Sequence, residues 1–436
     1  MTTMPSGGRT VLGAILGFLG SMRLAVWILL LLALLTLLGT FAQSTNSIHD
    51  VQREYFESWY VIGELPISVW GTPLWPDANN QPWALRIPLP GAVPLLALLA
   101  VNLIVGGVLR LRWSWRNVGI LVTHAGMLML LAAGFVKMSF SHAGMLGVFE
   151  TPPDGNLHPN RQYVTSRYSS AHDDELAVLI DRGDMIEERV VPEHQLWGAR
   201  RGVVALTGED LPFRIQVHHW IDHSRALPKG PMVKTLMPVV DGIYLESVPW
   251  PPGVQPLSEA ELSGCYVTIH AEGQAAIEAI LRSRRDEHFD KTRYPFSFEV
   301  RGQRYGLELR RVTRDLPFTV RLDKFQKRDH PGTISPMDFR SFVTADDGRS
   351  QQEAQIFMNY PLRRDGYVLF QSGWGPQGPG GQPLGPPWYS VFEVAANPSD
   401  TWPKIACWVI AGGLLIHFAM KLWRFLSSST RTALTN

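Results

Sequence analysis

Long apolar runs at both ends of this chain flank a polar central region, and this pattern predicts its organisation. A bilayer core of about 30 Å is crossed by a helix of roughly 20 apolar residues. Runs of that length cover residues 24–42, 90–109, 117–136 and 402–423. We therefore expect four transmembrane helices. The first run is long and no small-residue cleavage site follows it, so it is typical of an anchor rather than of a removed signal peptide.

The polar region, residues 138–401, has the pattern of strands. Its short segments are rich in β-branched and aromatic residues, alternate in polarity and end at Gly, Pro, Asp or Asn. Such segments cover residues 175–180, 213–221, 265–273, 296–302, 305–312, 318–325 and 367–374, with a predicted helix at 275–287 and a predicted loop at 373–387. We expect an antiparallel, mainly-β domain with a sandwich-like or barrel-like fold.

The predicted domains are thus residues 1–137 with three transmembrane helices, residues 138–401 as the mainly-β domain, and residues 402–436 as a fourth transmembrane helix with a tail. Basic residues set the orientation of such helices. They lie before the first run, between the second and third, and after the fourth: Arg9, Arg23, Arg110, Arg112, Arg116, Lys421, Arg424 and Arg431. Both termini are therefore expected in the cytoplasm and the β domain outside.

The loop between the first two runs carries four tryptophans, Trp59, Trp70, Trp75 and Trp83. Tryptophan favours the headgroup layer of a membrane. We expect this loop to lie on the outer membrane surface; alternatively, some of these rings line a cofactor or partner surface.

Composition excludes several functions. The 436 residues carry a formal net charge of +1, which gives no basic face for nucleic acid. The two cysteines, Cys265 and Cys407, form neither a CxxC dithiol nor a CxxCH haem-attachment motif. No hydrolase, kinase or dinucleotide motif has a supporting context.

A histidine cluster in the polar region, His218, His219 and His223 with Asp222, is a weak metal-site candidate. Adjacent residues of a strand point to opposite faces. Surface or core histidines are therefore the favoured interpretation.

The third apolar run contains His124, eight residues after Arg116 and hence roughly 12 Å deeper along a helix. An ionisable residue at such depth faces the bundle interior by default and is a functional-site candidate. Burial favours a neutral imidazole, whose lone pair suits a metal. His417 lies at a matched depth in the fourth run, about 10 Å from Arg424. The two could flank one haem iron, or each could hydrogen-bond a neighbouring helix.

Several motifs resemble the ResB (CcsB) family, membrane subunits of System II cytochrome c biogenesis. The membrane runs contribute GSMRLAVWILLLLALLTLLGTFAQ, NLIVGGVLRLR and GILVTHAG, and the polar region contributes LDKF, FRSFV, MNYPL and GYVLFQS in the family's order. The WGxxWxWD-type segment of the partner subunit is missing, so the chain does not resemble a fused form.

The resemblance implies a bacterial cytoplasmic (inner) membrane protein that works with a CcsA (ResC)-type multi-span partner. Together they bind and translocate haem b, bound transiently, and present it to the CxxCH thiols of apocytochrome c. A thiol-reducing thioredoxin-like protein is a further implied partner. The chain would then be a subunit of a cytochrome c synthase (haem lyase) complex with no catalytic residue of its own.

The resemblance makes His124 one axial haem ligand, with the other supplied by the partner. That assignment competes with the pairing of His124 and His417, because one iron has two axial positions. Cys407, in the fourth run, could also touch haem, although a buried thiol is more often an inert apolar residue.

Two other functions fit parts of the pattern. A cytochrome b-type redox subunit would place histidine pairs on its helices, and here the apolar runs hold only His124 and His417. A non-enzymatic anchored module would use the β domain alone to bind a partner.

Overall fold

The chain folds into two compact units. The computed structural model describes residues 11–43, 46–66, 68–69, 72–73, 84–111, 114–207, 211–248, 262–283, 295–333, 336–377 and 384–433. Met1–Ser141 and Asn397–Asn436 form one unit, here called the helical unit. His142–Ala396 forms the other, the β unit.

The helical unit contains the apolar runs. Its elements are α1 (Val11–Leu19), α2 (Met22–Ala42), α3 (Ile48–Val51), η1 (Gln52–Phe56), β1 (Tyr60–Pro66), β2 (Ser68–Val69), β3 (Thr72–Pro73), β4 (Ala84–Pro90), α4 (Ala92–Asn102), η2 (Leu103–Leu109), η3 (Trp115–Asn117), α5 (Val118–Phe140) and α7 (Trp402–Ala433). In the described part of the chain, four helical stretches are long and apolar enough to cross a membrane: Met22–Ala42, Ala92–Leu109, Trp115–Phe140 and Trp402–Ser427. The prediction of four such helices is confirmed.

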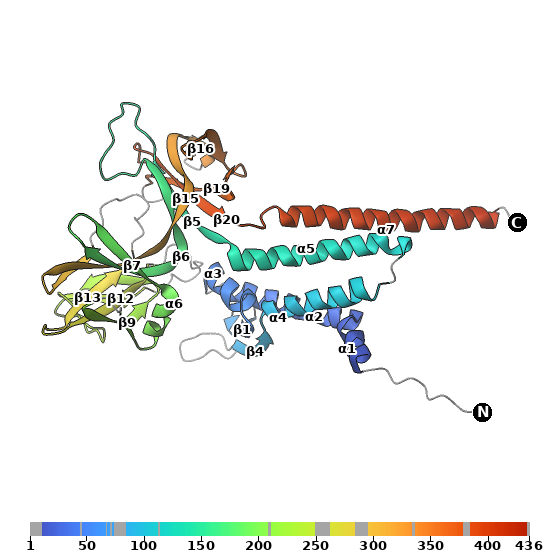
Figure 1. Cartoon of the computed structure of the whole chain (residues 1–436), viewed down its shortest axis with the longest axis horizontal. Helices are drawn as coiled ribbons and strands as arrows, with labels where there is room; N and C mark the ends of the chain where they lie inside the picture. Colours follow the sequence, from blue (N-terminus) through green and yellow to red (C-terminus); the bar gives the residue numbers. More distant parts are fainter. Residues whose placement is uncertain are drawn as a thin grey trace. The chain divides into compact units, whose positions relative to one another are not determined.

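Each helix packs against a neighbour in space: α7 contacts α5, α5 contacts α4 and η2, and α4 contacts α2 (Figure 1). Glycines set the spacing between α5 and α7. A Cβ atom on Gly119 would lie 2.6 Å from the backbone nitrogen of His417, and one on Gly413 would lie 2.5 Å from Oγ1 of Thr123. Such distances exclude any larger residue, so the two backbones touch here. Small residues at helix interfaces are the usual means of close packing in membranes.

The segment between α2 and α4 forms a hairpin on the side of α2. β1 and β4 pair antiparallel from Tyr60↔Pro90 to Pro66↔Ala84. Val61 and Leu89 from this pair are buried against Leu38 of α2. Trp59 is 74% exposed, whereas Trp70, Trp75 and Trp83 lie outside the described residues. The hairpin was not predicted, because the alternating residues are few and prolines interrupt them.

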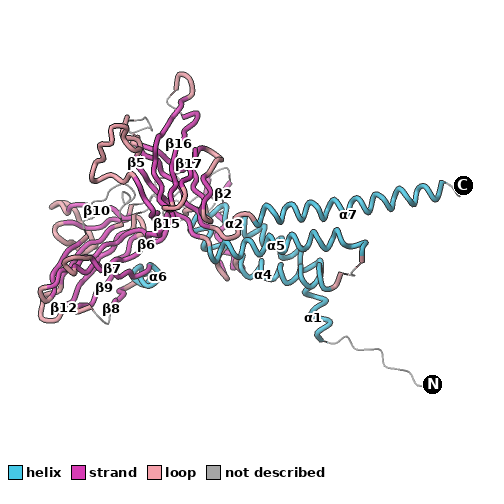
Figure 2. The backbone as a smooth tube through the Cα atoms, turned by 45° about the horizontal axis from the view of Figure 1, so that its top comes forward, coloured by secondary structure: helices cyan, strands magenta, loops and turns pink. Residues whose placement is uncertain are grey.

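The β unit consists of β5 (His142–Phe149), β6 (Val164–Asp181), β7 (Ile186–Pro192), α6 (Glu193–Leu196), η4 (Trp197–Arg200), β8 (Val203–Thr207), β9 (Phe213–Ile221), β10 (Ser224–Pro228), β11 (Ile243–Ser247), β12 (Gly264–Ala271), β13 (Ile277–Arg282), β14 (Phe296–Val300), β15 (Gln303–Asp329), β16 (Pro336–Asp346), β17 (Gln351–Phe357), β18 (Leu362–Arg364), β19 (Tyr367–Gly375) and β20 (Tyr389–Ala396). Figure 2 shows that strands dominate this unit. The mainly-β class is confirmed.

Two hydrophobic cores share the long strands β6 and β15. The first lies between the sheet β13-β12-β9-β8 and a layer formed by β7, β14, the last part of β6 and the first part of β15, as in a sandwich. The second is enclosed by the sheet whose strands follow the order β17-β16-β15-β6-β5-β20-β19-β18. This sheet closes on itself, because β17 at one edge contacts β18 and β19 at the other. Sandwich-like and barrel-like parts thus occur together in one unit.

A buried ion network joins β6 and β15 between these cores. Arg310, 5% exposed, donates from Nε to Oε1 of Glu175 at 2.8 Å and from Nη2 to Glu188 at 2.9 Å. Its neighbour Arg311 lies 3.4 Å from Asp174, which also accepts a hydrogen bond from Ser283. Desolvation raises the pKa of the Asp174 carboxyl. Buried ion pairs, rather than apolar contacts, therefore join β6 and β15 at the point where one core ends and the next begins.

Two local predictions were wrong. The predicted helix at 275–287 is strand β13 over its described part, because Ala279 and Leu281 alternate into the core opposite β12. The segments 305–312 and 318–325, predicted as two strands, are one strand, β15, with a register shift between Asp315 and Val320. The predicted strand 367–374 is β19, which ends one residue later at Gly375, and the predicted loop 373–387 is, over its described residues after Gly375, the connection to β20.

Replacing Arg310 with methionine is expected to lower the free energy of unfolding by roughly 3 to 5 kcal/mol, because Glu175 would keep a buried, uncompensated charge. Thermal or denaturant unfolding of the purified chain measures the change. The matched control is Arg167→Met, which breaks the exposed pair with Asp315 between the same two strands and is expected to cost less than about 1 kcal/mol. Equal losses in the two variants would contradict the prediction.

Candidate functional site

The imidazole of His124 lies at the contact between α5 and η2. A Cβ atom on Gly107 would lie 2.6 Å from Cδ2 of His124, 2.8 Å from Cγ and 3.1 Å from Nε2. The ring therefore packs directly on the backbone of Gly107, and any side chain at residue 107 would have to displace it. His124 is partly buried, as expected for a ring directed at a neighbouring helix.

A hydrogen bond fixes which ring nitrogen of His124 carries the proton. Nδ1 lies 2.8 Å from the carbonyl oxygen of Ile120, one turn earlier. A carbonyl only accepts, so Nδ1–H donates and the neutral ring keeps its lone pair on Nε2. Metal-ligating histidines commonly donate their second nitrogen to a backbone carbonyl in this way. The tautomer is thus the one that a metal or haem iron requires of an Nε2 ligand.

The surface under His124 is itself held firmly. η2 is a π-helix of seven residues, a wider helix that often occurs at functional sites. Gly106 contacts the backbone of Gly20, where an added Cβ would lie 2.7 Å from the carbonyl oxygen. One residue before η2, the amide of Asn102 donates to the carbonyl oxygens of Leu19 and Ser21, at 2.6 and 3.0 Å. These contacts fix η2 against the α1–α2 turn.

His417 lies on α7 and does not meet His124. Its backbone packs on Gly119 of α5, and its ring contacts Phe418 with centroids 5.6 Å apart. Five residues separate Gly119 from His124, which rotates the direction by about 140° around a helix. Among the contacts of the described residues, the two imidazoles have none with each other.

The cysteines are placed apart. Cys265 is fully buried in the first core of the β unit, where burial raises the pKa of its thiol. Cys407 is exposed on α7 of the isolated chain. Within the described ranges, no group of three or more His, Cys, Asp or Glu residues is arranged to hold a metal ion.

The histidine cluster of the β unit differs from the prediction. His218 and His219 were expected on opposite faces of a strand, but His219 has a φ of +50°, and the partner strand shifts register between Gly264 and Tyr266. The rings consequently meet edge to face, with their centroids 5.0 Å apart and their Nδ1 atoms 2.7 Å apart. Desolvation, followed by the proximity of His219, lowers the pKa of His218. Alternation failed because a bulge interrupts the strand.

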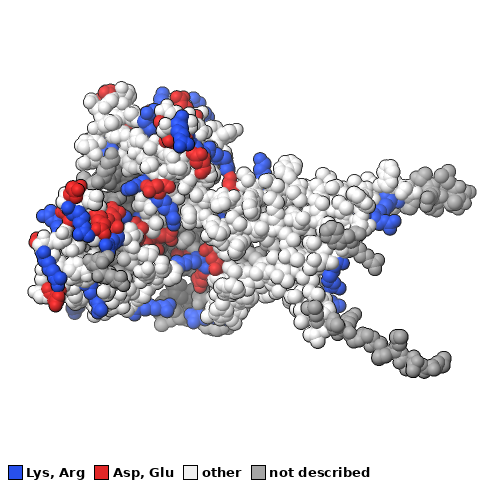
Figure 3. Space-filling view, in the orientation of Figure 1, with Lys and Arg blue, Asp and Glu red and all other residues white. Residues whose placement is uncertain are grey.

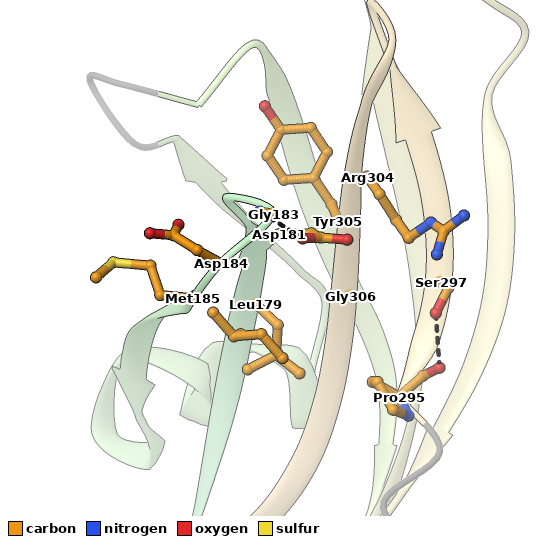
Figure 4. Close-up of a pocket in the computed structure, with 11 residues that line it drawn as sticks. Leu179, Asp181, Gly183, Asp184, Met185, Pro295, Ser297, Arg304, Tyr305 and Gly306 are labelled. Atoms are coloured by element: carbon orange, nitrogen blue, oxygen red, sulfur yellow. Dashed lines mark hydrogen bonds between the residues drawn. The ribbon is translucent and has the colours of Figure 1, made fainter.

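An open pocket of about 370 Å³ lies between the β6–β7 turn and the β14–β15 hairpin. Figure 4 shows Asp184 and Met185 on one side of it and Arg304 and Ser297 on the other. Ser297 is engaged locally, donating to the carbonyl of Pro295. Because the polar groups do not converge on one point, this pocket provides no catalytic arrangement.

The surface of the helical unit is apolar enough to contact lipid. The face seen in Figure 3 carries a broad uncharged band, and basic side chains lie toward the helix ends nearest the chain termini. Large apolar side chains are exposed along the helices, among them Trp27, Leu30, Phe135, Trp408 and Leu415. In water this surface would be unfavourable, so the apolar helices and the β unit together define a membrane protein with a large mainly-β domain.

The chain belongs to the ResB-like family, whose family model matches residues 112–384. Its membership implies a role in cytochrome c biogenesis, a process in which the family acts with a membrane partner. No curated protein matches the chain. The matched region includes His124 and most of the β unit.

Replacing Gly107 with alanine is expected to displace the His124 ring and destabilise the helical unit by about 1 to 3 kcal/mol, the usual cost of overpacking. Thermal unfolding of the detergent-solubilised chain measures the loss. Gly134→Ala is the control, since an added Cβ there meets nothing within 4 Å and alanine stabilises a helix interior by about 0.5 to 1 kcal/mol. A Gly107→Ala variant as stable as Gly134→Ala would show that the two side chains do not compete for space.

Proposed function

We propose that this protein is the haem-handling subunit of a System II cytochrome c biogenesis complex, with His124 as an axial haem ligand within the membrane. The observation that carries the proposal is the Nδ1 hydrogen bond to the Ile120 carbonyl. It leaves Nε2 as a lone-pair donor on a ring that the Gly107 backbone supports from one side.

The setting of His124 fits haem b as a transient cargo. Haem, when bound, supplies an iron for the imidazole and vinyl groups for the CxxCH thiols of apocytochrome c. A partly buried imidazole at the edge of a helix contact can be reached by a flat ligand from the side that the neighbouring helices leave open. Enclosure by one chain would oppose release, so a site completed by a second subunit suits a cargo that must move on.

The second axial ligand is assigned to a CcsA (ResC)-type multi-span partner. His417 is the weaker choice, since its backbone packs on the α7-facing side of α5 while His124 faces η2. The apolar side chains exposed on α2, α4, α5 and α7 suit contact with lipid and with the helices of such a partner. Cys407, exposed on α7, is not assigned a role.

Orientation follows from the basic residues. Arg23, Arg110, Arg116 and Arg424 lie at the helix ends predicted to be cytoplasmic, in agreement with the positive-inside rule. We infer a protein of the bacterial inner membrane with both termini in the cytoplasm. The β unit would then lie outside, where apocytochrome c and a thiol-reducing thioredoxin-like protein are encountered.

His124→Gly is expected to abolish or strongly reduce the haem Soret band of the chain co-purified with its membrane partner, and added imidazole is expected to restore it, because free imidazole replaces the missing side chain. Absorption spectra and a pyridine haemochrome assay measure the band and the haem content.

His417→Gly is the control for this experiment and is expected to keep the wild-type spectrum. An unchanged spectrum in His124→Gly would remove the ligand assignment. Permanently bound haem in the isolated chain, with reversible reduction by quinol, would instead favour a cytochrome b-type redox subunit.

A further inference from the structure

A groove of about 630 Å³ opens on the β unit beside the end of β9. It is lined by β9 and β11, by Arg200 of η4, and by the segment that joins β10 to β11. Its volume lies within the range of roughly 300 to 1,000 Å³ typical of small-molecule sites. The groove is far along the chain from His124 and belongs to the other unit.

His219 reaches this groove because of an unusual backbone. A φ of +50° is uncommon for any residue with a side chain, and residues held in this way cluster at functional sites. The bulge turns the His219 ring to the same side as that of His218, and both rings contact Tyr266, with centroids 5.8 and 5.9 Å away. Tyr266 is in turn fixed by a hydrogen bond from the amide of Leu245 to its hydroxyl oxygen, at 2.8 Å.

A chain of hydrogen bonds can orient the His219 ring. Nε2 of His218 lies 3.1 Å from the hydroxyl of Thr268, and the Nδ1 atoms of the two histidines are 2.7 Å apart. When Thr268 accepts from His218, His218 Nδ1 accepts from His219 Nδ1–H. His219 then carries its lone pair on Nε2, and its other ring nitrogen is held by a hydrogen bond, as in metal-ligating histidines.

The rest of the groove selects an amphipathic anion. Val233, Met237 and Leu245 contribute apolar surface, and Met237 adds a thioether, a ligand type that haem iron also accepts. Arg200 is paired with Glu193 and Asp222. Lys234 is exposed and, among the ion pairs of the described residues, has none, so its ammonium is available to a carboxylate.

We propose that this groove, the His219 groove, binds an iron porphyrin on the β unit, with His219 Nε2 as an axial ligand and Lys234 facing a propionate. An apolar macrocycle, carboxylates and an imidazole-binding iron are the three features that the lining matches. The identity of the ligand rests on the proposed function, but the site shares no residue with the His124 site. It would hold haem after the ligand has left the membrane.

The test is a titration of the full-length, detergent-solubilised chain with ferric haem, followed by the Soret band and by haem content after desalting. His219→Gly is the main variant, because glycine adopts a positive φ without strain and preserves the bulge. His270→Gly is the matched control: it lies on the neighbouring strand β12, is exposed, and its ring lies within hydrogen-bond distance of Gln216, which does not line the groove.

The wild-type chain, His270→Gly and His124→Gly are each expected to bind one equivalent of haem in the groove, and His219→Gly none, because the His124 site is completed by the membrane partner. Added imidazole is expected to restore the lost band of His219→Gly. Lys234→Ala is expected to weaken haem binding in the groove by about three- to tenfold, the loss of one charge-assisted contact.

The two proposals fail separately. A single equivalent that His124→Gly removes and His219→Gly leaves intact would overturn the His219 groove and retain the membrane site. A single equivalent that only His219→Gly removes would support the groove, whereas the membrane ligand is overturned only by an unchanged spectrum of His124→Gly in the complex with the partner. Equal loss in His219→Gly and His270→Gly would show adventitious binding and overturn the groove.

Discussion

Contact between backbones at glycine residues is the constraint on which the helical unit depends. No hydrophobic force drives helices together in lipid, so close packing must do so. Gly119 and Gly413 bring α5 against α7, and Gly107 brings η2 against α5. The position of His124 follows from these contacts, because its ring occupies the space that a side chain at residue 107 would fill.

The β unit is organised by a different constraint, the continuity of β6 and β15 through two cores. A strand that serves two cores has a short stretch between them where apolar contacts end. Here that stretch carries Arg310 and Arg311 with their carboxylate partners. Buried ion pairs add little net stability over apolar packing. Each charge does, however, require its own partner on the opposite strand. Such pairs therefore fix the strand register at the place where it changes.

Much of this architecture could be predicted from the sequence, because long apolar runs and short alternating segments each have one dominant structural outcome. The four apolar helices were placed within a few residues, as were β9, β12, β14 and β19 of the β unit, whereas most of its other strands, among them β5, β7, β16 and β20, were not predicted. The segment at 275–287 was misassigned because its residues favour a helix in isolation, whereas pairing with β12 decides the outcome.

The candidate site was only partly predictable. The depth of His124 was readable from Arg116, and its residue type indicated a ligand. Its contact with Gly107 could not be predicted, because the rotation of a helix about its axis depends on how neighbouring helices pack and not on the apolar run alone. The His219 groove was missed for a related reason: alternation assumes a regular strand, and the sequence of β9 does not mark the position of the bulge.

The adjacent glycines of η2 serve two different neighbours. Gly106 lies against Gly20 and Gly107 against His124, so consecutive positions of one π-helix face the α1–α2 turn and α5. Insertion or deletion of a single residue in this helix would turn each glycine toward the wrong neighbour and replace it with a larger side chain. The length of this short helix is therefore as constrained as the identity of its residues, and homologous chains should tolerate substitution at its lipid-facing positions far better than any change in residue number.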